Sequence, residues 1–332
     1  GGPLAGQLRD WGWPAVFYGC AVIVSLNFIM LFTYEEVESN YQGAQDPVRV
    51  FIDTIKNIVE PRLVAWLVIM SGFWLMMYQL WDLHPNFITD WIDSRSVVAA
   101  LSLPESWTTL TERGLQIKQE ILISLNSLMI VLFMVPVSIL VAKMRTLTAM
   151  VYGMTIATMG ILVSGDYRNG WIFVLGVVLF SCGEMLTGPK KQEYLGLIAP
   201  PGKKGLYLGY VNIPVGIGGG FGALLAGWLY GQFGEKAVLA QKYLAEHTDF
   251  LGERRWDGEL SSLTSTLGVE RTQAYNTLIA HLGITGEEVT QLLWTTYQPY
   301  QVWWPIAAIG VVSTIALVIY ARLARRWADM DR

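Results

Sequence analysis

Long apolar runs alternate with polar segments along almost the whole chain. Seven runs are long enough, at about 1.5 Å of rise per helical residue, to cross or nearly cross a hydrocarbon layer about 30 Å thick. They cover residues 13–33, 62–81, 119–141, 147–165, 171–189, 206–231 and 302–321. The pattern predicts an all-α, polytopic membrane protein in which about seven full transmembrane helices form a bundle, together with the tail of a further helix at residues 1–8.

One full charge, Glu184, lies inside the run at 171–189. Burying a bare carboxylate in the membrane costs on the order of several kcal/mol, so such a residue is usually functional and needs a partner or a proton. Ser181, Glu184 and Thr187 recur every third residue, which predicts one polar stripe facing a wet cavity. The alternative is a structural acid paired with a neighbouring helix.

The polar segments carry patterns of their own. The linker 34–61 includes an amphipathic stretch at 48–60, which is typical of a helix lying along the membrane surface. Residues 93–118 form a predicted connecting loop with room for one short helix, and 189–205 a polar break between two spans. The largest polar segment is the insert 234–301, with helical patterns at 236–246, 271–282 and 287–294.

Composition supports the membrane class. The chain is 53% hydrophobic but only 15% charged, where a soluble domain carries about 25% charged residues. Its net charge of -4 offers no basic face for nucleic acid. Cys20 and Cys182 both fall in apolar runs, so we expect packing residues and no disulfide. The histidines, His84, His247 and His281, lie far apart without metal-ligand spacing, and we expect no metal or cofactor.

A glycine cluster, GGGFGA, lies at 218–223 within a predicted span. It formally fits a nucleotide-binding pattern, but that pattern requires a position between a strand and a helix. We therefore expect these glycines to serve close helix packing.

Basic residues predict the orientation. The segments 34–62, 142–146, 189–205 and 322–332 hold 13 lysines and arginines in 62 residues, whereas the segments on the opposite side hold 10 in 114. Because cytoplasmic loops are enriched in Lys and Arg, we expect the first side and the C-terminus to be cytoplasmic, and the insert to be external.

Several short motifs point to a family. The opening GGPLAGQLRDWGWPAVFY resembles the junction of the fifth and sixth helices of the major facilitator superfamily. FWLMMYQ, SLNSLMIVLF and the Gly183-Glu184 pair resemble the seventh, eighth and tenth helices of its proton-coupled oligopeptide transporters. The resemblance implies that residues 1–33 end an N-terminal helix bundle and that 62–332 form a C-terminal six-helix bundle. It also implies that N-terminal helices of the same protein precede Gly1.

The resemblance implies roles for particular residues. Asn126 and Glu184 would line the central cavity and bind the amino end of a peptide, with Glu184 also coupled to protons. Trp74, Tyr78 and Gln79 would border the same cavity. Ser181, which belongs to the polar stripe, is a further candidate for binding the solute. Tyr78 departs from the family, whose members often carry an acid there, and Asp82, one turn later, is the candidate substitute for proton coupling. Alternatively, Asn126 only bridges helices and the aromatic residues only pack.

These observations favour a secondary active transporter of the cell membrane that moves a small solute by proton-coupled alternating access, with di- and tripeptides as the first candidates. A facilitator of another small organic solute and a non-transporting receptor or scaffold on the same fold are the alternatives. An integral membrane enzyme is disfavoured, because no Ser, His and Asp set or paired catalytic carboxylates converge on one membrane face. The expected partners are the solute, protons and the lipid bilayer.

Overall fold

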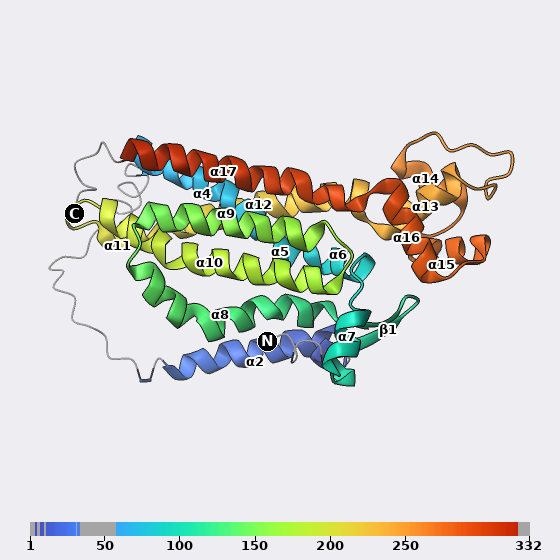
Figure 1. Ribbon diagram of the computed structural model, residues 1–332, viewed down its shortest axis with the longest axis horizontal. Coiled ribbons are helices and arrows are strands. Elements are labelled where there is room, and N and C mark those ends of the chain that lie inside the picture. The colour runs from blue at the N-terminus through green and yellow to red at the C-terminus, as the bar shows by residue number, and fades with distance from the viewer. Residues whose placement is uncertain (1–3, 5–6, 10, 31, 34–57, 325–332) are drawn as a thin grey trace.

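The computed structural model describes residues 4, 7–9, 11–30, 32–33 and 58–324. Figure 1 shows one elongated helical bundle with a smaller group of helices at one end. Residues 48–57 of the predicted surface helix at 48–60, like most of the linker 34–61, lie outside the described residues.

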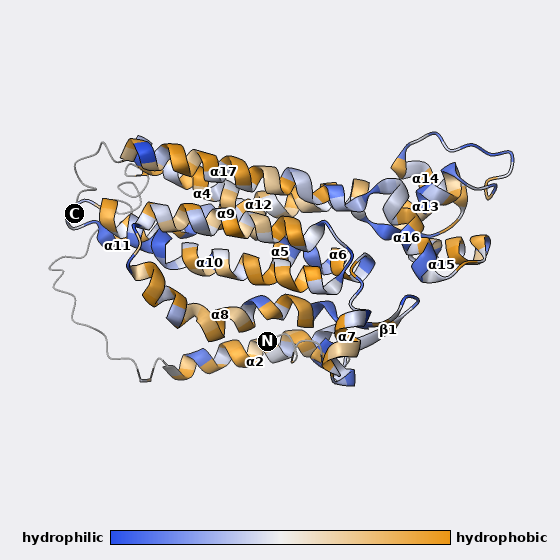
Figure 2. Cartoon of the chain, viewed as in Figure 1, coloured by the Kyte–Doolittle hydropathy of each residue, from blue (hydrophilic) through white to orange (hydrophobic). Residues whose placement is uncertain are grey.

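Among the described residues, seven apolar helical segments form the bundle. Six are long and apolar enough to cross a membrane, and α2 is a shorter apolar helix. The bundle contains α2 (Trp13–Met30), α4 (Pro61–Met77), α5 (Gln79–Asp82), α8 (Gln119–Ala142), α9 (Thr146–Gly165), α10 (Gly170–Ile198), α11 (Lys204–Gly209), α12 (Asn212–Leu229) and α17 (Trp303–Ala324). Figure 2 shows apolar residues along the bundle and polar residues toward its ends. This is the predicted all-α, polytopic, major-facilitator-like fold.

The break predicted at 189–205 begins later than expected. Helix α10 continues through Pro189 and ends at Ile198. Proline removes one backbone hydrogen bond, and packing of the following turn compensates for it. Lys190 is buried there and donates to the Met144 carbonyl at 3.1 Å, while its ammonium lies 2.8 Å from Glu193. Two turns that the sequence assigned to a loop are therefore helical.

The region 93–118 contains the expected short helix, α7 (Arg95–Leu101), and a hairpin that the sequence analysis missed. A 3-10 turn (Glu105–Trp107) leads into β1 (Thr108–Thr111), which pairs antiparallel with β2 (Gly114–Ile117). The strands are too short to show a clear alternation. Arg113 in the turn is buried and donates to the carbonyls of Ile92 and Thr89, at 3.1 and 2.6 Å, next to the end of α6 (His84–Asp90).

The insert forms its own small helical layer beyond the bundle (Figure 1). All three predicted helices are confirmed as α13 (Lys236–Glu246), α15 (Arg271–Leu282) and α16 (Gly286–Tyr297). A fourth helix, α14 (Leu260–Leu267), was not predicted; η2 (Tyr230–Gly234) and η3 (Pro299–Val302) join the insert to the bundle. The Arg168 guanidinium lies 2.6 Å from Glu287, and the Trp91 indole donates to the Gly234 carbonyl at 2.8 Å. These contacts fix the insert to the bundle.

Glycines allow close packing at two helix interfaces. A Cβ at Gly218 would lie 2.7 Å from the Leu75 backbone nitrogen, which confirms that the cluster at 218–223 packs α12 against α4. A Cβ at Gly183 would lie 2.4 Å from the Ala157 backbone nitrogen. Gly183 therefore allows α10 to pack closely against α9. This packing fixes the position of the next residue, Glu184, relative to α9.

Candidate functional site

Helix α10 positions the buried acid. The helix begins at Gly170, where the Asn169 side-chain oxygen accepts hydrogen bonds from the backbone nitrogens of Trp171 and Ile172, at 2.9 and 3.3 Å. This cap satisfies two otherwise unpaired donors at the start of the helix. Glu184 then lies near the middle of α10 and is half-buried, while Ser181 one turn earlier is fully buried.

Asn126 on α8 joins this group. Its amide nitrogen donates to Glu184 Oε2 at 2.9 Å and lies 3.1 Å from Ser181 Oγ. Because a carboxylate only accepts, the bond to Glu184 fixes which end of the amide carries the nitrogen. The amide oxygen of Asn126 then has no hydrogen-bond donor among the described residues. A carboxylate and a spare amide oxygen at one place are acceptors that suit an ammonium group.

A lysine lies on the same face of α10. Lys191 follows Glu184 by seven residues, close to two helical turns. Its ammonium lies 4.1 Å from the ring centroid of Trp74 on α4, and it is close enough to Glu184 for the two opposite charges to attract. The structure thus gives Glu184 a nearby cation that the sequence analysis missed.

An aromatic row on α4 and α5 follows this face of α10. Ring centroids lie 5.8 Å apart for Trp74 and Tyr78, 6.0 Å for Tyr78 and Trp81, and 6.1 Å for Trp81 and Phe180. Phe180 lies one turn before Glu184, so the row extends from the Lys191 end to the Phe180 end. Trp74 and Tyr78 are half-buried, and Trp81 is exposed.

Two predicted site residues lie apart from this group. Gln79 is fully buried and its amide nitrogen donates to the Leu75 carbonyl at 2.8 Å, beside Gly222 of α12. Asp82 is half-buried at the end of α5, and no described side chain bonds or pairs with it. The structure therefore brings Asn126, Ser181 and Glu184 together, with Trp74 and Tyr78 beside Lys191, but joins neither Gln79 nor Asp82 to them.

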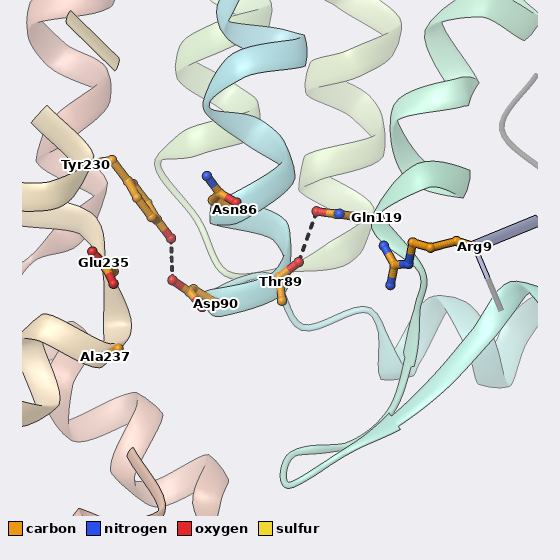
Figure 3. A pocket seen from close by; sticks show the side chains of 8 residues that line it. All are labelled: Arg9, Asn86, Thr89, Asp90, Gln119, Tyr230, Glu235 and Ala237. Atoms are coloured by element: carbon orange, nitrogen blue, oxygen red, sulfur yellow. Dashed lines mark hydrogen bonds between the residues drawn. The ribbon is translucent and has the colours of Figure 1, made fainter. Parts of the chain in front are cut away.

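A cavity lies at the end of the bundle where the insert begins (Figure 3). It has a volume of about 470 Å³ and is lined by Arg9, Asn86, Thr89, Asp90, Gln119, Tyr230, Glu235 and Ala237. Tyr230 donates its hydroxyl hydrogen to Asp90, and Thr89 bonds to Gln119 at 3.1 Å. Arg9 also pairs with Glu120 at the start of α8. This cavity does not contain the Glu184 group.

Comparison with known proteins adds one relative. Over 242 residues, or 72% of this chain, the sequence is 25% identical to YttB, an uncharacterized MFS-type transporter of Bacillus subtilis (strain 168). The match covers 55% of that protein, so the chain spans about half the length of the relative it matches. No protein-family model matches the chain. The similarity supports a place in the major facilitator superfamily.

The local sequence after Glu184 explains why Lys191 was missed. The sequence PKKQEYLGLIAP begins with a proline and two lysines, which predicted a loop. The seven-residue spacing from Glu184 is the signal that could have found Lys191, provided that the helix was allowed to continue through Pro189. Trp81 was missed because it stood at the predicted end of a span, where tryptophan is common.

Proposed function

We propose that this chain is part of a secondary active transporter that moves a small organic solute across the cell membrane, with di- and tripeptides as the first candidates. The single observation that carries the proposal is the bond between Asn126 and Glu184, inside two helices that are long and apolar enough to cross a membrane. A charged group at that depth is usually kept for a solute or an ion. The similarity to a transporter of the same superfamily supports this interpretation.

Proton coupling follows from the surroundings of Glu184. Desolvation favours the protonated form of a carboxyl group, whereas a nearby cation such as Lys191 favours the ionised form. When two conformations of a transporter differ in water access and in the distance between these groups, Glu184 takes up a proton in one and releases it in the other. Asp82, at the end of α5, is proposed as a second titrating acid.

Peptides are the first candidates because of the acceptors at the site. The amino group of a peptide would donate to the Glu184 carboxylate and to the Asn126 amide oxygen, both partly shielded from water. The half-buried rings of Trp74 and Tyr78 would contact the rest of the solute. No cofactor is needed for such binding, and the proposed activity is not enzymatic.

Counterflow tests this proposal. The full-length protein is reconstituted in liposomes loaded with unlabelled Ala-Ala, and labelled Ala-Ala is added outside. We expect transient accumulation of label that an excess of external Ala-Ala abolishes. Counterflow of another small organic solute, but not of Ala-Ala, would move the proposal to a different substrate class. Absence of any exchange would favour a receptor or scaffold.

A further inference from the structure

Three exposed cations lie at the end of the bundle opposite the insert. Lys143 and Arg145 belong to the turn between α8 and α9, and Lys204 begins α11. Figure 1 places this turn and α11 at that end of the bundle. All three side chains are exposed, and none forms an ion pair within the part of the chain that the structure describes. We call these three residues the basic rim.

The last turns of α10 connect the members of the basic rim. The Lys190 ammonium donates to the carbonyl of Met144 at 3.1 Å, which holds the turn between α8 and α9 against α10. Gly196 follows Lys190 by six residues, or about 9 Å along the helix axis. A Cβ at Gly196 would lie 3.3 Å from Lys204 Cε, so the Lys204 side chain lies against the same helix. The positive charges of the rim therefore surround the end of one helix.

Two described acids at this end already have partners. The Glu193 carboxylate lies 2.8 Å from the Lys190 ammonium and accepts a hydrogen bond from Thr146 at 2.6 Å. Glu60, before the start of α4, accepts from the Tyr207 hydroxyl at 2.8 Å. Neither acid pairs with a cation of the basic rim among the described residues. The rim is therefore free to attract an anionic partner.

Exposed apolar side chains lie one helical turn from the basic rim, on the membrane side. Ile139 and Leu140 are exposed on the last turns of α8, four and three residues before Lys143. Leu208 is exposed four residues after Lys204, and a Cβ at Gly196 would lie 3.9 Å from its Cδ2. Residues three or four apart are neighbours on a helix surface. A charged group next to an apolar surface is the order in which a phospholipid presents its headgroup and its chains.

We propose that the basic rim is a docking surface for anionic phospholipids, whose headgroups lie at its three cations while the acyl chains lie along the neighbouring exposed apolar residues. Lysine and arginine at the end of a membrane span attract anionic headgroups, and their long side chains keep the charge at headgroup level. The proposal goes beyond the proposed function, because it does not depend on which solute the protein moves or on whether it moves one.

The test compares two lipids that differ only in the headgroup. Native mass spectrometry of the full-length protein in detergent measures the apparent Kd of dioleoylphosphatidylglycerol, which is anionic, and of dioleoylphosphatidylcholine, which has no net charge. We expect the Kd of the anionic lipid to be at least about tenfold lower, because each cation near an anionic headgroup strengthens binding by roughly fivefold. Equal Kd values for the two lipids would overturn the proposal.

Charge-matched variants assign the preference to the basic rim. The double variant Lys143→Gln with Arg145→Gln should reduce the preference for the anionic lipid by at least about fivefold, and adding Lys204→Gln should reduce it further. The control, Arg254→Gln with Arg255→Gln, removes the same charge from exposed residues of the insert and should keep the wild-type preference. An equal loss in the control would mean that net charge alone selects the lipid, which would overturn the proposal.

Two further measurements distinguish a lipid surface from a site for a soluble phosphate compound. Leu140→Gln should weaken the binding of both lipids and leave the ratio of their Kd values unchanged, because it changes only the surface for the acyl chains. An excess of glycerol phosphate, which carries the charge without the chains, should leave the binding of the anionic lipid unchanged. Displacement of the lipid by glycerol phosphate would reject the lipid surface and assign the rim to a soluble anion.

Discussion

Two pairs of opposite charge among the described residues differ in whether the two charged groups touch. Arg168 and Glu287 touch at 2.6 Å, and the same guanidinium also donates to the Trp91 carbonyl and to Gln291. Glu184 and Lys191 attract each other without touching, and both keep open hydrogen-bonding positions. The first pair joins the insert to the bundle. Under the proposed function, the second is the pair that exchanges partners during a transport cycle.

The difference shows how to separate structural from functional charges in a membrane protein. Burial alone does not do so, since the Arg168 side chain is only 11% exposed and still belongs to a docking contact. What distinguishes the pairs is direct contact between the two charges, which Arg168 and Glu287 make and Glu184 and Lys191 do not. The predictions below test this criterion.

Breaking the pair of Arg168 and Glu287, called the closed pair below, should have the largest effect on stability. Arg168→Met keeps much of the side-chain volume but leaves Glu287 without its closest cation. Removing one partner of a well-shielded ion pair costs about 3 kcal/mol, somewhat less here because Glu287 is partly exposed. Chemical unfolding in detergent measures the change, with Arg271→Met, from an exposed pair with Glu235, as the control. Equal effects of the two variants would contradict the distinction.

Glu184 and Lys191 are called the open pair below. Removing the Asn126 amide beside them should change solute binding more than stability. Asn126→Ala removes an acceptor from the proposed ammonium site, which costs about 1–3 kcal/mol for a charged hydrogen bond and weakens binding by roughly 5- to 150-fold. Concentration-dependent competition by Ala-Ala measures it. Asn276→Ala, an exposed amide in the insert, is the control. If solute affinity were unchanged, Asn126 would be a helix-bridging residue.

His84 is a buried histidine whose two ring nitrogens both have hydrogen-bond partners while the ring is neutral. It therefore provides a third buried group for the comparison. His84 lies 2.8 Å from Ser164 Oγ and 3.2 Å from the Gln79 carbonyl, and burial lowers its pKa from 6.5 to about 3. The unfolded chain therefore binds an extra proton between these pH values. Stability from this group is complete above pH 6.5 and falls by about 1.4 kcal/mol per pH unit as the pH drops toward 3.

The variant His84→Gln should lack this part of the pH dependence. Unfolding free energies of wild type and variant at pH 6.5 and 4.5 give the difference, and the exposed His247→Gln should follow wild type. Parallel curves for wild type and His84→Gln would show that His84 does not stay neutral in the folded protein.

The smallest effect on the free energy of unfolding is expected for Arg95, which lies beside the closed pair. Arg95 is a second cation near Glu287, at 3.5 Å, but its side chain is 43% exposed. Exposed ion pairs contribute about 0–1 kcal/mol, so Arg95→Gln should change the free energy of unfolding by no more than that at moderate salt. A loss as large as that of Arg168→Met would mean that exposure does not weaken this contact.

The sequence predicted the parts of the molecule that depend on periodicity. The apolar runs gave the spans, and the 3.6-residue patterns gave three helices of the insert within a few residues of their observed bounds. Asn126 and Glu184 were expected to line one cavity, and Ser181 to share a polar stripe with Glu184. The structure places the Asn126 amide in hydrogen-bond contact with both Ser181 and Glu184, whereas the cavity and the solute remain predictions. Only the resemblance related Asn126 on one helix to Glu184 on another, because no spacing along the chain relates the two residues.

Other features depended on contacts between distant segments. The strands at 108–111 and 114–117 are too short for a reliable alternation, and α10 passes Pro189 only because Lys190 and the following turn pack against the bundle. The Lys191 contact requires Trp74, which lies more than a hundred residues earlier in the chain. No local pattern contains such information.

The central claim is that the open pair serves transport and the closed pair serves structure. Proton-driven accumulation in liposomes and the unfolding temperature should both be measured for two matched variants of the full-length protein, Glu184→Gln and Glu287→Gln. Because an amide cannot ionise, the account predicts that Glu184→Gln loses uphill accumulation and keeps its unfolding temperature, whereas Glu287→Gln is destabilised and still accumulates solute. Uphill uptake by Glu184→Gln at the wild-type rate, or loss of accumulation in Glu287→Gln alone, would contradict the account.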